Sequence, residues 1–228
     1  MLTKFGLRSK NIYEEIKLDR LLSILFYLPV VFIALPFHEA AHAYAAYKMG
    51  DNTAKYCGRL TLNPLKHLDP IGVVCLLLGG FGWAKPVPVE IRRFKNPKVG
   101  FAITAIAGPI SNLLLALIAF LILLLIRIFV PTFFLFIGKF ANIYFVIYQL
   151  LVVFCVSNVM LACFNLIPIP PLDGSRIASL ILPDKAYVWF LKNEKYFQLV
   201  LIAAVVLGVF DKPLGAIQDF ILNIILTI

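Results

Sequence analysis

Two histidines and a glutamate in the stretch HEAAH are the residues of this chain best suited to chemistry. His38 and His42 are four positions apart, so a helix would place both imidazoles on one face, close enough to hold one metal ion. Neutral imidazole is a good zinc ligand. Glu39 would lie beside the metal without binding it, where its carboxylate can take a proton from a metal-bound water. The pattern predicts one zinc ion per chain and hydrolysis of a peptide bond by zinc-activated water.

The apolar segment around HEAAH makes the motif stronger evidence for a metal site than the five residues alone. The chain has 228 residues, of which 61% are hydrophobic and 14% are charged, and it contains three histidines. A soluble domain would have about a quarter charged residues. Ionisable groups inside an apolar segment are costly unless they have a partner or a function. A metal site explains the position of HEAAH; a histidine pair that only satisfies its neighbours is the alternative.

A catalytic zinc site needs a third protein ligand, and two histidines supply only two. Asp173 is favoured because it follows the proline-interrupted end of a long apolar run, NLIPIPPLDG. The backbone must open at those prolines, so the carboxylate can turn inward at the depth of the histidines. A buried carboxylate would also offset the charge of the ion. Four other residues are weaker alternatives: His67 and Asp69 in a polar loop, and Asp51 and Glu194.

The apolar runs indicate an all-α polytopic membrane protein. A bilayer core about 30 Å thick needs about 20 apolar residues in a helix, and three runs are long enough. The sequence predicts core transmembrane helices near 21–49, 99–128 and 140–167, and a C-terminal helix or helical hairpin within 197–228. Pro29 and Pro36 are expected to bend the first helix.

A small re-entrant or β element is expected between the first two core helices. Residues 71–83 are apolar but short and glycine-rich, which suits a re-entrant segment better than a full span. Residues 85–91, KPVPVEI, alternate as a strand does, and their prolines favour an edge position. An exposed strand edge could pair with an extended substrate, so this segment is a candidate substrate clamp.

One membrane-embedded domain is expected over residues 1–228. It would comprise a polar N-terminal lead (1–20), a catalytic core (21–177) and a C-terminal helical region (178–228). The four cysteines form no CxxC pair and are interpreted as small apolar residues.

The formal net charge of +9 indicates a lipid surface rather than a nucleic acid as partner. The lysines and arginines fall in loops between apolar runs, where orientation signals and anionic headgroups explain them. If 48–98 and 172–195 share one side, that side has the larger basic count and is predicted to be cytoplasmic. This places the protein in the cell membrane as a multi-pass protein, with HEAAH in the cytoplasmic half of the bilayer.

Three motifs together resemble the site-2 protease family of intramembrane zinc metalloproteases: HEAAH, GPISN and NLIPIPPLDGSRI, in the family's order between residues 36 and 177. The resemblance implies that His38, His42 and Asp173 bind zinc and that Glu39 is the base. It also implies that Asn165 hydrogen-bonds substrate or the developing oxyanion, although this amide could simply satisfy the broken helix end. The chain resembles short members that have no PDZ or CBS domain. The implied partner is a transmembrane protein or peptide as substrate.

Asn112, in GPISN, is interpreted as a helix-packing residue rather than a chemical one. Two rival functions remain open on the sequence. One is a membrane ion or metal transporter that uses the intramembrane His and Asp residues. The other is an inactive protease-like scaffold, although the intact motif residues disfavour it.

Overall fold

The computed structural model describes residues 20–73, 84–129 and 139–227, and these residues form an all-helical protein without strands. Its elements are α2 (Arg20–Pro29), the π-helical turn η1 (Val30–Ala34), α3 (Leu35–Lys48), α4 (Thr53–Tyr56), α5 (Pro64–His67), η2 (Ile91–Arg93), α7 (Pro97–Phe129), α8 (Lys139–Asn165), α9 (Asp173–Ile177), η4 (Ala178–Leu180), α10 (Asp184–Lys192), α11 (Glu194–Val206) and α12 (Asp211–Thr227).

Three stretches are long and apolar enough to cross a membrane, as predicted: Ile24–Lys48, Pro97–Phe129 and Asn142–Asn165. The first contains two prolines, and its helix continues through them by way of a π-helical turn. After Pro29 the helix widens into η1, where the Leu35 N–H reaches back five residues to the Val30 carbonyl. Pro36 then lies in the first turn of α3, where a missing N–H costs least.

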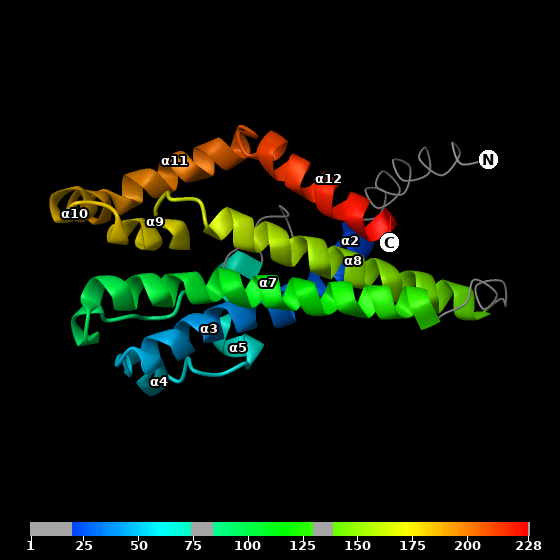
Figure 1. Cartoon of the computed structure of the whole chain (residues 1–228), viewed down its shortest axis with the longest axis horizontal. Coiled ribbons are helices and arrows are strands. Elements are labelled where there is room, and N and C mark those ends of the chain that lie inside the picture. The colour runs from blue at the N-terminus through cyan, green and yellow to red at the C-terminus, as the bar shows by residue number, and fades with distance from the viewer. Residues whose placement is uncertain (1–19, 74–83, 130–138, 228) are drawn as a thin grey trace.

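Helix α7 is the centre of the fold and packs against both α3 and α8 (Figure 1). Its buried residues recur every three or four positions and are mostly small, and they include Ala105, Gly108, Asn112 and Ala116. Small residues let helix backbones approach closely in a membrane, where lipid is as apolar as leucine. The rest of the α7 surface has exposed isoleucines and leucines, as a lipid-facing helix should.

The C-terminal region is not a helical hairpin. It consists of two helices joined at a bend. Helices α11 and α12 meet at a bend of 65° and are not antiparallel. Gly208 lies just beyond α11 with a φ of +69°, a conformation that glycine adopts without strain. Helix α12 returns to pack against α8 (Figure 1).

The predicted strand at 85–91 is wrong. Residues 85–90 have no regular structure and η2 begins at Ile91; the described part of this region has one isolated antiparallel bridge, between Leu68 and Ala84. Pro86 and Pro88 have no N–H, so alternate positions cannot donate to a ladder. Most of the predicted re-entrant element (74–83) and the polar lead (1–19) lie outside the described residues.

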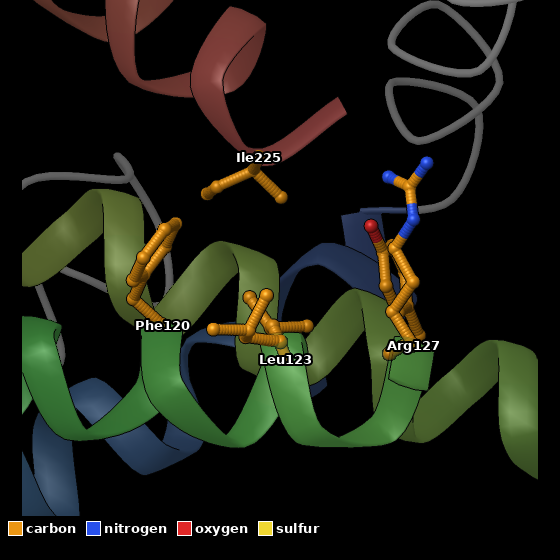
Figure 2. Close-up of a pocket in the computed structure, with 6 residues that line it drawn as sticks. Phe120, Leu123, Arg127 and Ile225 are labelled. Carbon is orange, nitrogen blue, oxygen red and sulfur yellow. The ribbon is translucent and has the colours of Figure 1, made fainter. Parts of the chain in front are cut away.

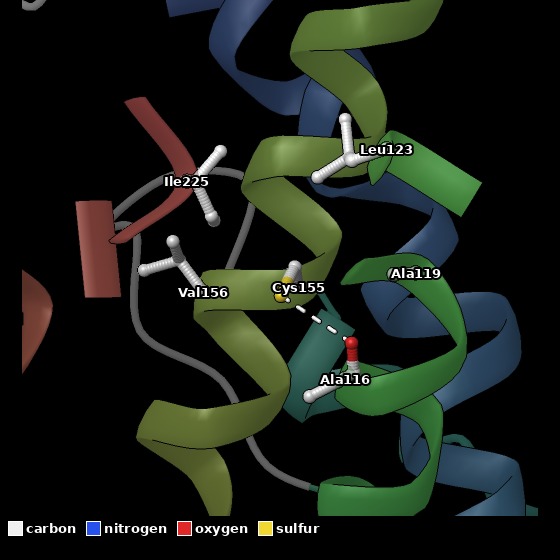
Figure 3. Close-up of a cluster of buried hydrophobic side chains, with 6 residues drawn as sticks. All are labelled: Ala116, Ala119, Leu123, Cys155, Val156 and Ile225. Carbon is white, nitrogen blue, oxygen red and sulfur yellow. Dashed lines mark hydrogen bonds between the residues drawn. The ribbon is translucent and has the colours of Figure 1, made fainter. Parts of the chain in front are cut away.

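The second half of α7 packs mainly through apolar contacts with α8 and α12. A small pocket lies there, and Figure 2 shows Phe120 and Leu123 of α7 facing Ile225 of α12, with Arg127 at its edge. The adjacent cluster in Figure 3 includes Cys155, whose thiol reaches the Ala116 carbonyl at 3.4 Å. This packing joins the helices but contains no group suited to hydrolysis.

Candidate metal centre

His38, His42 and Asp173 come together in the buried interior of the molecule. The two Nε2 atoms are 3.0 Å apart, and Asp173 Oδ2 lies 3.2 Å from each of them. All three residues are at most 7% exposed. Within the described ranges this is the one group of three metal-ligating side chains that could share an ion. The sequence-predicted ligand set is therefore brought together by the fold.

The two histidines share a face because they lie one turn apart on α3, as the spacing predicts. Their rings meet edge to face with centroids 4.6 Å apart. That face points at α7, where Gly108 lies against both rings. A Cβ added at Gly108 would fall on both imidazoles, so only glycine lets α7 come this close. The glycine of GPISN thus makes room for the histidines.

Asp173 reaches the histidines through a compact turn between α8 and α9. After α8 ends at Asn165, the proline-rich residues 166–172 turn the chain back, and Asp173 is the first residue of α9. Gly174 makes this turn possible, because a Cβ there would collide with the Leu166 and Ile167 carbonyl groups. The LDG triplet therefore combines a ligand with the glycine that positions it.

The other ring nitrogen of each histidine is also held. His42 Nδ1 lies 2.7 Å from the Thr104 carbonyl of α7. His38 Nδ1 lies 2.5 Å from Asn112 Oδ1, also of α7. Metal-binding histidines typically have such a partner, which fixes the ring orientation and its tautomer. In each histidine, Nδ1 is hydrogen-bonded to α7 and Nε2 faces the cluster.

The donor set fits a zinc ion. Atoms bound to one tetrahedral zinc at 2.0–2.1 Å lie about 3.3 Å apart, close to the separations of 3.0–3.2 Å found here. Asp173 Oδ2 is buried and has no hydrogen-bond partner. His42 must donate its Nδ1 proton to the Thr104 carbonyl, which can only accept, so its Nε2 presents a lone pair to Asp173. When both imidazoles are neutral, a buried anionic oxygen faces their lone pairs, an arrangement that a bound cation would stabilise.

Glu39 lies beside the cluster and contacts the extended segment 84–90. Its Oε2 accepts a hydrogen bond of 3.0 Å from the backbone N–H of Val87. The segment is fixed at two further points: Arg59 donates to the carbonyls of Lys85 and Pro86. The contact between this segment and Glu39 is thus made by the backbone of the segment, and the sequence did not predict it.

The alternative ligands have structural roles instead. His67 Nε2 lies 2.7 Å from the Thr61 carbonyl, and Asp69 accepts from the backbone N–H groups of Ile71 and Gly72. Glu194 begins α11. None of these residues belongs to the metal-ligating group found in the described part of the chain.

Asp51, the remaining alternative, joins the end of α3 to the segment before α7. It accepts from the Thr53 hydroxyl and from the backbone N–H groups of Thr53 and Glu90. Burial raises the pKa of Asp51, but these hydrogen bonds and the charge of Arg93 outweigh burial and hold the pKa below its ordinary value. The Asp51 carboxylate therefore stabilises the local fold by joining these two segments.

Sequence reasoning undervalued Asn112 and missed Asn158. Asn112 contacts a candidate ligand directly, and its Nδ2 donates to Asn158 Oδ1 at 2.9 Å. Both are completely buried. The available signal was the presence of amide side chains inside two apolar spans, Asn112 in α7 and Asn158 among several amides in α8, since buried polar groups in a membrane are expensive.

Asn165 is the last residue of α8, and its Nδ2 donates to the Leu161 carbonyl at 3.0 Å. This is the helix-end contact that the sequence left open as an alternative to a catalytic role. Its proposed contact with substrate stays a prediction.

A membrane-spanning helical protein with a buried His–His–Asp cluster beside a glutamate has the architecture of a membrane metallopeptidase. The sequence matches the Peptidase family M50 over residues 26–208, which include all three candidate ligands. Because this match covers most of the chain, the protein belongs to peptidase family M50, the site-2 protease family.

Individual relatives agree with this assignment. The chain is 42% identical over 196 residues to the "Putative zinc metalloprotease YwhC" of Bacillus subtilis, covering 86% of this chain and 84% of that protein. It is 31% identical over 173 residues to the "Zinc metalloprotease MJ0392" of Methanocaldococcus jannaschii, covering 76% of this chain and 38% of that protein. It is 34% identical over 148 residues to the "Putative zinc metalloprotease Rip2" of Mycolicibacterium smegmatis, covering 62% of this chain and 51% of that protein. No solved structure matches.

Proposed function

We propose that this protein is an intramembrane zinc metalloprotease that hydrolyses a peptide bond within or next to a transmembrane segment of a membrane-protein substrate. The observation that carries the proposal is the buried cluster of His38, His42 and Asp173, assembled from a span and a proline-rich turn, with Glu39 adjacent. The membership of the chain in family M50 supports it.

The residues divide the chemistry between them. His38, His42 and Asp173 would hold zinc, which supplies Lewis-acid polarisation of the substrate carbonyl and a lower pKa for a bound water. The Glu39 carboxylate takes a proton from the attacking water at one of its oxygens. As the carbon–nitrogen bond breaks, Glu39 returns that proton to the leaving amine. In this proposal Asn165 donates its amide hydrogen to the developing oxyanion.

The depth of the site favours a substrate within the membrane. His38 lies ten residues before Lys48, the end of its span, which corresponds to about 15 Å along a helix. The exposed faces of the helices around it are apolar. A peptide bond that reaches this depth belongs to a segment that is itself embedded in lipid.

The proposed location is the cell membrane, with the active site in the cytoplasmic half. The α4 region and α9–α10 lie toward the same end of the bundle (Figure 1), which supports the premise that the basic residues near these helices share a side. The proposed partners are lipid and a transmembrane protein or peptide.

Residues 85–91 are the proposed substrate clamp, although 85–90 have no regular structure and η2 begins at Ile91. Their backbone is extended around Glu90 and contacts Glu39 through Val87. An extended backbone next to the catalytic carboxylate can pair with a substrate that has been unwound for cleavage. Proline at Val89 would remove one N–H of this segment and is expected to reduce cleavage of a membrane substrate while leaving bound zinc unchanged.

The proposal is tested with the purified protein in liposomes and a single-span substrate, with zinc content measured in parallel. Glu39→Gln keeps an acceptor for the Val87 N–H but cannot take a proton, so cleavage should fall about 10²- to 10⁴-fold while one zinc per chain is retained. Glu194→Gln, at the start of α11 and outside both the proposed clamp and the metal-ligating group, is the matched control and should cleave like wild type.

Mass spectrometry of the products locates the cleaved bond. A bond inside or next to the apolar segment of the substrate supports the intramembrane assignment, and cleavage confined to its soluble part contradicts it. Undiminished cleavage by Glu39→Gln would rule out Glu39 as the base. Zinc binding without hydrolysis, together with zinc flux into liposomes, would favour a transporter.

A further inference from the structure

Two asparagines form a buried polar chain that crosses three helices of the membrane domain. Asn112 on α7 contacts His38 Nδ1 on α3 at 2.5 Å, and its Nδ2 donates to Asn158 Oδ1 on α8 at 2.9 Å. Asn158 Nδ2 in turn donates to the Phe154 carbonyl at 2.8 Å. Both asparagines are 0% exposed, in spans whose other buried residues are mostly apolar.

The direction of every hydrogen bond in this chain is determined by its last member. The Phe154 carbonyl can only accept, so the Asn158 atom that faces it must be the NH₂ group. The Asn158 oxygen then faces Asn112 and must receive its NH₂ group. The Asn112 oxygen is left facing His38, and an oxygen can only accept from Nδ1. His38 must therefore have a proton on Nδ1, and in the neutral imidazole that can bind a metal its lone pair is on Nε2.

His42 reaches the same tautomer by a shorter route, because its Nδ1 meets a backbone carbonyl directly. His67 has the opposite arrangement: its Nε2 faces the Thr61 carbonyl, so this nitrogen donates. The backbone partner thus determines each tautomer, and only His38 depends on intervening side chains.

We propose that Asn112 and Asn158 are positioning residues for the metal centre: they fix His38 with its Nε2 lone pair toward His42 and Asp173, and the polarity is imposed from the backbone of α8. The inference rests on the proposed metal site. A neutral amide suits this place, because a carboxylate would add another charge at membrane depth.

The first test measures the zinc dissociation constant of the purified protein by competition with a chelator. Asn112→Leu is close in volume and leaves His38 Nδ1 without an acceptor, so the dissociation constant should rise about 10- to 100-fold. Asn158→Leu removes only the anchor of Asn112 and should raise it less. The double variant should bind zinc no more weakly than Asn112→Leu, because both changes interrupt one chain.

Ser111→Ala is the matched control. This neighbour of Asn112 also loses one side-chain hydrogen bond, to the Gly108 carbonyl of its own helix at 2.7 Å. Its dissociation constant for zinc should stay within about twofold of wild type, since the lost contact does not reach an imidazole.

The second test is nitrogen-15 and proton NMR of the zinc-loaded protein with labelled histidine. The wild type should show a strongly hydrogen-bonded, slowly exchanging Nδ1 proton on both His38 and His42. In Asn112→Leu the His38 signal should lose this protection and the His42 signal should keep it. A role limited to helix packing would leave both signals alike.

The outcomes separate this inference from the proposed function. If wild type binds no zinc, the metal site itself is wrong. If wild type binds zinc but Asn112→Leu binds it equally well with His38 Nδ1 still protected, the positioning role is wrong and the protease assignment is untouched. If Asn112→Leu fails to fold, the zinc dissociation constant and the His38 Nδ1 signal of Asn158→Leu decide between the same two outcomes.

Discussion

The two halves of α7 pack against their neighbours by different means. From Thr104 to Asn112 the buried face meets α3 and α8 through a glycine, a backbone carbonyl and an amide, each with a specific partner. From Ala116 to Leu123 it meets α8 and α12 mainly through apolar contacts, with one weak thiol hydrogen bond from Cys155 to the Ala116 carbonyl (Figure 3). Leu123 is 15 residues beyond Gly108, about 22 Å along the helix.

This difference suggests that the first half of α7 positions the metal ligands and that the second half stabilises the fold. Polar contacts have one correct geometry, and a buried group without a partner is costly. Apolar contacts tolerate small adjustments. Changes in the first half should therefore alter zinc binding, and changes in the second half should alter stability without altering zinc binding.

The largest expected effect is that of metal removal. Zinc at about a thousand times its dissociation constant should stabilise the folded wild type by about 4 kcal/mol, and Asp173→Asn should abolish most of this gain. In the zinc-free state Asp173→Asn should be at least as stable as wild type, because its amide can donate to an imidazole lone pair. Thermal unfolding with zinc or chelator measures both. Asp219→Asn, an exposed change on α12, should keep the full zinc response.

Leu123→Ala tests the apolar half. It should lower the free energy of unfolding by about 2 kcal/mol, near the lower end for such changes because lipid can occupy part of the space. Its zinc dissociation constant should match that of wild type. A large change in zinc affinity here would show that the two halves are coupled.

The same substitution at two glycines sharpens the comparison. Gly108→Ala places a methyl group against both imidazoles, so it should cost about 1–3 kcal/mol and weaken zinc binding. Gly215→Ala on α12 meets nothing within 4 Å and should be neutral or stabilising by up to about 1 kcal/mol. Unfolding and zinc titration of the two variants are measured side by side; equal behaviour would contradict the close approach of α7 to the histidines.

The smallest effect concerns Asp51, which is outside both halves. Because its pKa is lowered in the folded state, the ionised carboxylate contributes stability at pH values above its ordinary value. That contribution is lost as the pH falls through the lowered folded value. Asp51→Asn should cost about 0.5–1 kcal/mol at neutral pH, because the amide loses the charge that its hydrogen-bond donors favour, and the difference from wild type should shrink toward pH 3. A constant difference over that range would contradict the charge-based explanation.

Local sequence determined much of the architecture. The lengths of the apolar runs predicted the three spans to within a few residues, because a lipid bilayer requires a minimum length of apolar helix. The four-residue spacing of His38 and His42 predicted their shared face, since helical geometry is local. The pattern at 85–91 misled, because two prolines prevent the ladder that its alternation suggested.

Only the tertiary structure decided which distant groups complete the site. It brought Asp173 to the histidines, gave His67 and Asp69 structural partners, and placed Asn112 and Asn158 in line with His38. The contacts of His38 with Asp173 and Asn112, and of Asn112 with Asn158, join positions 46 to 135 residues apart, and no local pattern encodes such distances. They depend on how closely α3, α7 and α8 approach, which glycines and proline-rich turns permit but do not by themselves specify.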